Sequence, residues 1–512
     1  MLAQVSSFPA PVGGWDAISP IAQMPPDRAY QLDNWTCRPG WLEIRRGMQP
    51  WSTGVGGSST PVETLMTYNG VLSSKLFSVA GGTIYNSSSS GAASSTGQTG
   101  FSNSRFQYTN FTDGASNHYI VAVNGADAPV KFDGTTWTAF APTGVVPSTI
   151  VHVAVHKGRL WLVPVSSTIA YYMPIQAAAG AATPFELGPF MTKGGDIVAI
   201  GTWSVDTRQT VDDYWAAITS RGQVLVYQGT DPSSITTWSL VGVYDLGAPI
   251  GRRCFLKIAG DLLLITLDGV VPMSQMLSTD RASANRVSLT SIIMSQMNMQ
   301  ARSYANNFGW QLIEYPRGTL AILNIPTTPN SVAQQYVMNT LTGAWSRWTG
   351  QNVNCWELFN DNVYVGANNG KVYQADQDSA DDTTPITATV KTAFNYFGSR
   401  GVLKRYTMLR PIITTDSFVT PGVGLNVDFQ DTATATVPST VTNNGAQWDV
   451  AKWDVDVWPV NANVTASWQT IAGIGQCASV LTTVQSVKTG SAAGVTLQLN
   501  GWDIAYEAGG VI

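Results

Sequence analysis

The central part of the chain repeats a pattern of two short strands joined by a tight turn. Between residues 64 and 376, hydrophobic and polar residues alternate in short runs, with the period of a half-buried β-strand. A dipeptide containing Gly, Asn or Asp interrupts each pair of runs, and such residues adopt the positive φ that tight hairpins need. The predicted turns are Asn69-Gly70, Asp113-Gly114, Lys157-Gly158, Arg221-Gly222, Gly260-Asp261, Arg317-Gly318 and Asn360-Asp361.

These hairpins predict an all-β fold with an irregular β-propeller of six or seven blades. Their spacing is mostly about 40 to 60 residues, which is the period of propeller blades. Each small sheet buries both faces only by packing against the next one, and a ring of blades provides this. A β-sandwich or a solenoid of similar hairpins is the alternative.

The pattern changes at both ends of this repeating region. Residues 1–50 are interpreted as an amino-terminal strap and first strand, and residues 51–375 as the propeller. The span 288–303 has helical spacing and predicts one helical insertion. An acidic, polar stretch at 376–385 is typical of a linker. Residues 386–512 alternate again and predict a separate carboxyl-terminal β-sandwich.

Composition and charge argue against several classes of protein. The chain has 512 residues, of which only 12% are charged, and its net charge is −5. Basic residues occur as isolated pairs at Arg45-Arg46, Arg252-Arg253 and Lys404-Arg405. Tight DNA binding requires clustered cations that displace counterions from phosphates, so it is disfavoured, although passing contact is not excluded.

The cysteines and the apolar segments indicate the cellular compartment in which the chain is made. The four cysteines are far apart and form no CxxC pair, so we expect buried free thiols. The amino terminus lacks the basic start and apolar core of a signal peptide. No apolar run approaches the roughly 18 residues of a membrane helix. We expect synthesis in a cytoplasm and no membrane insertion by this chain.

The sequence shows no convincing catalytic, cofactor or metal site. His152 and His156 lie in an alternating strand, and we interpret them as partly exposed strand residues. The acidic pairs Asp212-Asp213 and Asp381-Asp382 lack an evident partner and are interpreted as solvated turns. Asp133-Gly134 resembles half of a sialidase-type Asp-box, but it occurs once, and a hairpin turn explains it better.

Two groups of residues near the ends of the chain form recognisable motifs. The strap predicts an extended segment, a turn and a strand that Gly47 ends; its motif residues are Pro25, Pro26, Asn34, Pro39, Gly40, Leu42, Arg45 and Gly47. The carboxyl-terminal module has tryptophans five residues apart, followed by glycine motifs; these residues are Trp448, Asp449, Trp453, Asp454, Trp458, Gly473, Gly475, Gly509 and Gly510.

In this order along the chain, the two groups resemble the tail nozzle or hub family of short-tailed bacteriophages, also called packaged-DNA stabilisation or tail tubular protein B. The sequence departs from the family pattern at Met24 and Trp41, where smaller or more variable residues are expected.

The resemblance implies a non-enzymatic virion structural protein without a cofactor, located in the phage tail. Several copies, usually six, would form a homo-oligomeric ring around a channel that retains packaged DNA and passes it during ejection. The implied partners are a head-to-tail adaptor above, and tail fibres, a spike or a needle below. Contact with genomic DNA would be transient and non-specific.

Two other functions remain open from the residues alone. The aromatic Trp-Asp segment suits the binding of sugar faces, which fits a receptor- or glycan-binding tail protein. A propeller glycosidase or depolymerase would instead need two carboxylates about 5 to 10 Å apart in a cleft.

Overall fold

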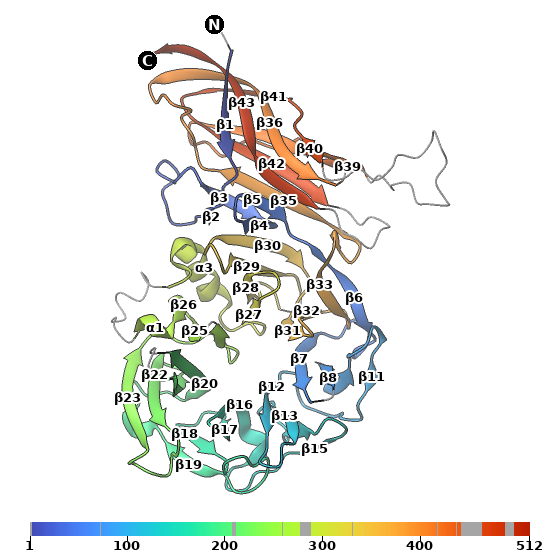
Figure 1. Cartoon of the computed structure of the whole chain (residues 1–512), viewed down its shortest axis with the longest axis vertical. Coiled ribbons are helices and arrows are strands. Elements are labelled where there is room, and N and C mark those ends of the chain that lie inside the picture. Colours follow the sequence, from blue (N-terminus) through green and yellow to red (C-terminus); the bar gives the residue numbers. More distant parts are fainter. Residues whose placement is uncertain are drawn as a thin grey trace.

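The computed structural model describes residues 3–71, 73–206, 211–258, 260–276, 288–329, 331–416, 418–436, 438–441, 463–486 and 496–511. These residues form a β-propeller below a β-sandwich, as Figure 1 shows. The Trp-Asp motif (Trp448, Asp449, Trp453, Asp454 and Trp458) lies outside the described residues.

The propeller has seven blades among the described residues, and the first strand of each blade faces the axis (Figure 1). The first four blades are β7 (Val62–Asn69), β8 (Ser74–Ala80), β9 (Thr83–Asn86) and β11 (Ser94–Ser95); β12 (Gln107–Thr112), β13 (His118–Val123), β14 (Val130–Phe132) and β15 (Trp137–Ala139); β16 (Ile150–His156), β17 (Arg159–Pro164), β18 (Ile169–Tyr172) and β19 (Thr183–Glu186); and β20 (Ile197–Asp206), β21 (Val211–Thr219), β22 (Gln223–Gly229) and β23 (Trp238–Asp245).

Of the last three blades, the fifth has three described strands, the sixth has four consecutive strands, and the seventh takes its fourth strand from the amino-terminal part of the chain. They are β24 (Phe255–Ile258), β25 (Asp261–Thr266) and β26 (Gly269–Pro272); β27 (Gln311–Tyr315), β28 (Leu320–Ile325), β29 (Ala333–Asn339) and β30 (Trp345–Gln351); and β31 (Cys355–Phe359), β32 (Asn362–Gly366), β33 (Val372–Asp378) and β6 (Gly47–Thr53). The outer strand of the seventh blade therefore comes from the amino-terminal part of the chain. Antiparallel pairing of β6 with β33 closes the ring.

Six of the seven predicted hairpins join the first two strands of a blade, and the seventh, at Arg221-Gly222, joins β21 to β22, the second and third strands of the fourth blade. At the third blade, Lys157 and Gly158 have φ angles of 47° and 70°; at the seventh, Asn360 and Asp361 have φ angles of 49° and 61°. Two consecutive positive φ angles match the twist of the flanking strands. The propeller prediction is confirmed, with seven blades.

The β-sandwich has two sheets that enclose one core. One sheet contains β1 (Ala3–Pro9), β4 (Trp35–Arg38), β5 (Trp41–Ile44), β36 (Val402–Thr415), β40 (Asn463–Thr465), β41 (Gln469–Gly475) and β43 (Leu497–Val511). The other contains β3 (Arg28–Asp33), β35 (Thr384–Thr392), β38 (Gly422–Val427) and β42 (Ala478–Ser486). Trp502 is fully buried between them, and its indole N–H donates to Thr482 Oγ1 at 2.9 Å.

Short elements connect these units. They are β2 (Gly14–Trp15), β10 (Gly91–Ala92), β34 (Ala380–Asp381), β37 (Phe418–Thr420), β39 (Ser439–Val441), η1 (Pro147–Thr149), η2 (Gly188–Phe190), α1 (Met273–Met276), η3 (Ser291–Ile293) and α3 (Met294–Tyr304). The helical insertion expected at 288–303 is thus a 3₁₀ turn followed by α3.

The expected boundaries at the strap and the linker need correction. The strap supplies β1, β3, β4 and β5 to the sandwich and β6 to the propeller. Gly47 begins β6, whereas we expected it to end a strand. The predicted linker at 376–385 is largely strand, because β34 pairs with both β6 and β35. β6 is distant from β34 in sequence, so local composition does not reveal this pairing.

Gly47 allows β6 to pass very close to β34. A Cβ at Gly47 would lie 1.9 Å from the carbonyl oxygen of Ala380, whereas a Cβ at Gly401 would have no atom within 4 Å. We predict that Gly47→Ala lowers the free energy of unfolding by about 1–3 kcal/mol, because the backbone must shift to relieve the clash. Urea denaturation measures the change, with Gly401→Ala as the matched control. Equal stability of the two variants would contradict the role given to this close approach.

Candidate functional site

Two strap residues of the sequence motif meet in a buried network between the propeller and the sandwich. Asn34 adopts φ 60° and donates through Nδ2 to the Thr387 carbonyl at 2.8 Å. Its Oδ1 accepts from Arg45 Nε at 2.8 Å and from the backbone N–H of Thr349 at 2.8 Å. Arg45 donates to both carboxylate oxygens of Asp381, at 2.9 and 2.5 Å, and to the Thr349 carbonyl at 3.0 Å. We call Asn34, Arg45, Thr349, Asp381 and Thr387 the junction network.

The junction network joins three parts of the chain that are remote in sequence. Thr349 belongs to β30 of the sixth blade, Asp381 to β34, and Thr387 to β35 of the sandwich. Both charged side chains are almost completely buried, with exposed fractions of 1% for Arg45 and 7% for Asp381. A bidentate pair of this kind fixes orientation as well as distance. The strap therefore binds the two domains to each other.

Most of the other described motif residues lie at turns or in strands of the sandwich. Leu42 is fully buried. Pro39 and Gly40 separate β4 from β5, and Gly40 has φ 96°. Gly473 and Gly475 lie on β41 and Gly509 and Gly510 on β43, whereas Pro25 and Pro26 precede β3. These placements indicate structural roles and do not form a cavity.

The interpretation of the acidic pairs as solvated turns without partners was wrong for Asp213, Asp381 and Asp382. Asp381 is buried against Arg45, and Asp382 accepts from Lys371 and from the Tyr373 hydroxyl, both at 3.2 Å. Asp213 accepts from Lys157 at 3.1 Å. Asp381 and Asp213 have partners from strands and turns distant in sequence, whereas the partners of Asp382 lie only 11 and 9 residues before it.

His156 is less exposed than expected, whereas His152 is partly exposed, as predicted. His152 Nε2 lies 3.0 Å from the Ile200 carbonyl, and His156, only 2% exposed, lies 3.2 Å from Thr202 Oγ1 through Nδ1. Burial lowers the pKa of each imidazole to about 4, so both are neutral near pH 7. They pack between the third and fourth blades. The four cysteines are free and buried, as predicted.

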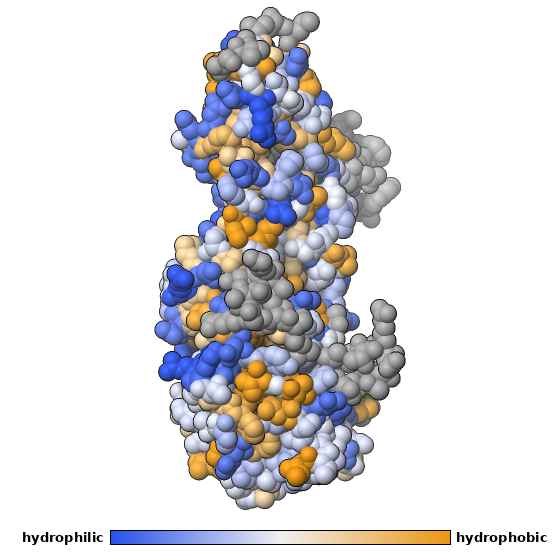
Figure 2. Space-filling view, turned by 90° about the vertical axis from the view of Figure 1, so that its left-hand side faces the viewer, coloured by the Kyte–Doolittle hydropathy of each residue, from blue (hydrophilic) through white to orange (hydrophobic). Residues whose placement is uncertain are grey.

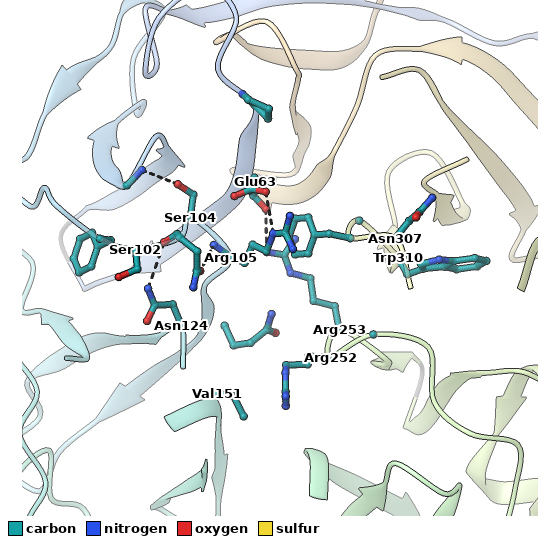
Figure 3. Close-up of a pocket in the computed structure, with 18 of the residues that line it drawn as sticks. Glu63, Ser102, Ser104, Arg105, Asn124, Val151, Arg252, Arg253, Asn307 and Trp310 are labelled. Atoms are coloured by element: carbon teal, nitrogen blue, oxygen red, sulfur yellow. Dashed lines mark hydrogen bonds and ion pairs between the residues drawn. The ribbon is translucent and has the colours of Figure 1, made fainter. Parts of the chain in front are cut away.

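A cavity of about 730 Å³ lies inside the ring (Figure 3). Its walls come from residues that precede or begin the first strands of five blades, including Glu63, Gln107, Val151, Arg252 and Trp310. A second cavity of about 360 Å³ shares Gln107, Arg252 and Arg253 with it. We call the first cavity the axial pocket.

Arg253 extends from the fifth blade and binds to strands of other blades around the axis. It donates to Thr64 Oγ1 at 2.8 Å, to the Phe106 carbonyl at 3.2 Å and to Gln311 Oε1 at 3.5 Å. These partners belong to, or directly precede, β7, β12 and β27. Burial lowers the pKa of Arg253, but an arginine starts so far above neutrality that it remains charged.

A second arginine lies over the same aromatic ring in this pocket. Phe308 has the guanidinium of Arg105 4.6 Å and that of Arg253 5.2 Å from its ring centre. Arg105 also forms an ion pair with Glu63 at 2.9 Å, and Figure 3 shows these side chains converging. The stack combines cation–π attraction with a partly buried charge pair.

Deeper along the axis, Glu357 on β31 has an unusual protonation equilibrium. Burial raises the pKa of its carboxyl to about 7, against the opposing effects of Tyr108, the Leu358 amide and Arg253. Burial also raises the pKa of Tyr108 far above its usual range. Glu357 therefore titrates near neutral pH beside a permanent cation.

Sequence reasoning identified Arg252-Arg253 only as an isolated basic pair and missed Glu63, Arg105 and Glu357. One local signal was available: Glu63 and Glu357 interrupt runs that form the first strand of a blade. In a propeller these strands line the axis. The missing information was the ring geometry that brings the blades together.

Within the described ranges, no cluster of three or more His, Cys, Asp or Glu side chains is arranged to hold a metal ion. No helix in this part of the chain has both the length and the hydropathy that a membrane crossing requires.

Comparisons with known proteins give only distant likenesses. No family model matches the chain, and no curated protein matches it. The computationally designed Ika8 protein is 11% identical with a TM-score of 0.38, covering 64% of this chain and 99% of its own. BBS1N, from a complex with ARL6DN, is 10% identical with a TM-score of 0.42, covering 67% and 99%. BamB from Moraxella catarrhalis is 11% identical with a TM-score of 0.36, covering 65% and 95%. The fold assignment therefore rests on the strand pairing itself.

The raised pKa of Glu357 predicts a pH-dependent stability. The folded protein keeps a proton on this carboxyl between pH 4.5, its ordinary pKa, and about 7, whereas the unfolded chain releases it. The free energy of unfolding should therefore decrease across this window, by up to roughly 3 kcal/mol. Glu357→Gln should lack this decrease and gain stability relative to the wild type as the pH rises.

Urea unfolding of both proteins at several pH values measures the difference between them. His152 and His156, whose lowered pKa values reduce stability as the pH falls below 6.5, are present in both proteins. Their contribution therefore cancels in the difference between the two curves. Glu186→Gln, at an exposed glutamate on β19, is the control. Wild-type and Glu357→Gln curves that stay parallel would disprove the assignment.

Proposed function

We propose that this chain is a virion structural protein, the nozzle or hub subunit of a short-tailed bacteriophage tail. Several copies, usually six, would form a ring whose channel retains packaged DNA and passes it during ejection. The observation that carries the proposal is the junction network. Asn34 and Arg45 of the family-like strap motif bind both the propeller and the sandwich.

The junction suits a mechanical role. It ties a propeller to a sandwich through a buried bidentate ion pair and through β-strands shared by both units. Two units joined in this way resist bending, as a subunit of a pressurised channel must. The strap motif would then be needed for rigidity, because Asn34 and Arg45 position the two domains.

Electrostatics is compatible with a passage for DNA. Six copies, each with a net charge of −5, would carry a total of −30. A wall with little positive charge releases few counterions from DNA and therefore does not hold the duplex. Such a wall favours sliding over binding.

Ring contacts between identical subunits are heterologous and close by rotation. Exposed apolar side chains are available on the fourth blade and on the sandwich. Val241 and Val243 on β23 are 42% and 37% exposed, and Ile474 on β41 is 61% exposed. Figure 2 views the side that carries β23 and shows hydrophobic residues gathered over the propeller.

We predict that the purified full-length chain forms a ring with an axial opening, alone or when its head-to-tail adaptor is added. Light scattering after size-exclusion chromatography and electron microscopy give the copy number and the opening. Val241→Asp and Ile474→Asp test the two apolar surfaces, and loss of the ring in either variant locates the subunit contact. A chain that stays monomeric with the adaptor present would overturn the proposal.

A depolymerase and a receptor-binding protein would each give a result in solution that a nozzle subunit would not. A depolymerase would release oligosaccharides from host polysaccharide, and a receptor-binding protein would bind host cells as an isolated chain. A nozzle subunit should do neither.

A further inference from the structure

We propose that the axial pocket binds a small, hydroxyl-rich anion, with Arg252 holding its carboxylate or phosphate group. This inference concerns the interior of one propeller and does not depend on ring assembly. The pocket volume of about 730 Å³ lies within the range of small-molecule sites.

The charge of the pocket is the first argument. Three arginines, Arg105, Arg252 and Arg253, and one carboxylate, Glu63, line it. Glu63 pairs with Arg105, whereas Arg252 and Arg253 have no ion pair with a carboxylate among the described residues. The four side chains therefore carry a net charge of +2 in a chain whose total charge is −5. Unbalanced cations in a partly closed cavity attract an anion.

Arg252 is the arginine best placed to bind a ligand. Its guanidinium makes one protein hydrogen bond among the described residues, from Nη1 to the Val198 carbonyl at 3.3 Å, and the carboxylate of Asp196 acts on it only through space. Arg253, in contrast, uses its guanidinium to join the blades. A guanidinium has five N–H donors, so Arg252 retains donors for an oxyanion. Figure 3 shows Arg252 at the floor of the drawn pocket, beside Val151.

The remaining polar groups indicate hydroxyl groups on the ligand. The amide side chains of Gln107 and Asn306 line the pocket and form no hydrogen bond with any described residue. A side-chain amide both donates and accepts, as a hydroxyl group does. The Phe308 ring, which lies near two guanidiniums, adds an apolar surface at the wall. The combination of a cation, amides and an aromatic ring suits a sugar acid or a sugar phosphate.

Isothermal titration of the full-length protein at low ionic strength tests the proposal. The probes are glucuronate, glucose 6-phosphate and neutral glucose, each at concentrations up to about 10 mM, because a single oxyanion contact can be weak. We expect at least one anionic probe to bind at least about tenfold more tightly than glucose, the difference expected from a charged hydrogen bond. The stronger of the two anions identifies carboxylate or phosphate as the preferred group.

Variants locate the site. Arg252→Gln should weaken binding of the preferred anion at least about tenfold, and Gln107→Ala should weaken it less. Arg221→Gln removes an exposed arginine from a hairpin turn and should leave binding unchanged. Circular dichroism confirms that each variant folds. If Arg252→Gln does not fold, Gln107→Ala still tests whether the anion binds in this pocket. Absence of binding by both anions, or equal binding by wild type and the folded pocket variants, would overturn the inference.

Discussion

Closure of the propeller ring depends on a segment that lies more than 300 residues before the strand it pairs with. β6 completes the seventh blade by pairing with β33, and Arg45, two residues before β6, is anchored to Asp381. Burying both charges costs several kcal/mol in desolvation, so the pair stabilises the fold only because its hydrogen bonds are satisfied. Asn34 and the Thr349 carbonyl supply the additional bonds to Arg45. Loss of either ionic partner would leave a buried charge, which typically costs about 3–5 kcal/mol.

Because of this closure, the propeller and the sandwich are built from interleaved segments of the chain. The strap contributes strands to the sandwich before it reaches the propeller, and β35 continues from the seventh blade into the sandwich. Neither unit therefore contains all of its strands without residues from the opposite end of the chain. Contacts at such large sequence separation form late, because loop-closure entropy must be overcome first. Propeller and sandwich are thus expected to reach their final packing together.

Features set by neighbouring residues could be predicted from the sequence, whereas features set by strands distant in sequence could not. The seven hairpins were predictable because a turn such as Lys157-Gly158 carries its own conformational requirement within two residues. The strap and the linker were not, because Gly47 and Asp381 owe their conformation to strands far away in the sequence. The axial pocket was missed for the same reason. Glu63 and Arg252, which both line this pocket, are more than 100 residues apart, and only the ring brings them to one axis.

The axis of the propeller and the proposed passage for DNA are different spaces. Arg253 binds to residues of three other blades around the axis, and its guanidinium and that of Arg105 both lie close to the Phe308 ring. Side chains thus narrow the interior of each propeller to a cavity of small-molecule size. If DNA passes, it must pass through an opening formed between subunits, whose walls are outer surfaces of the chain. The arginine-lined interior then stays separate from the anionic wall, so one chain can hold a small anion inside each propeller without binding the duplex that slides past it.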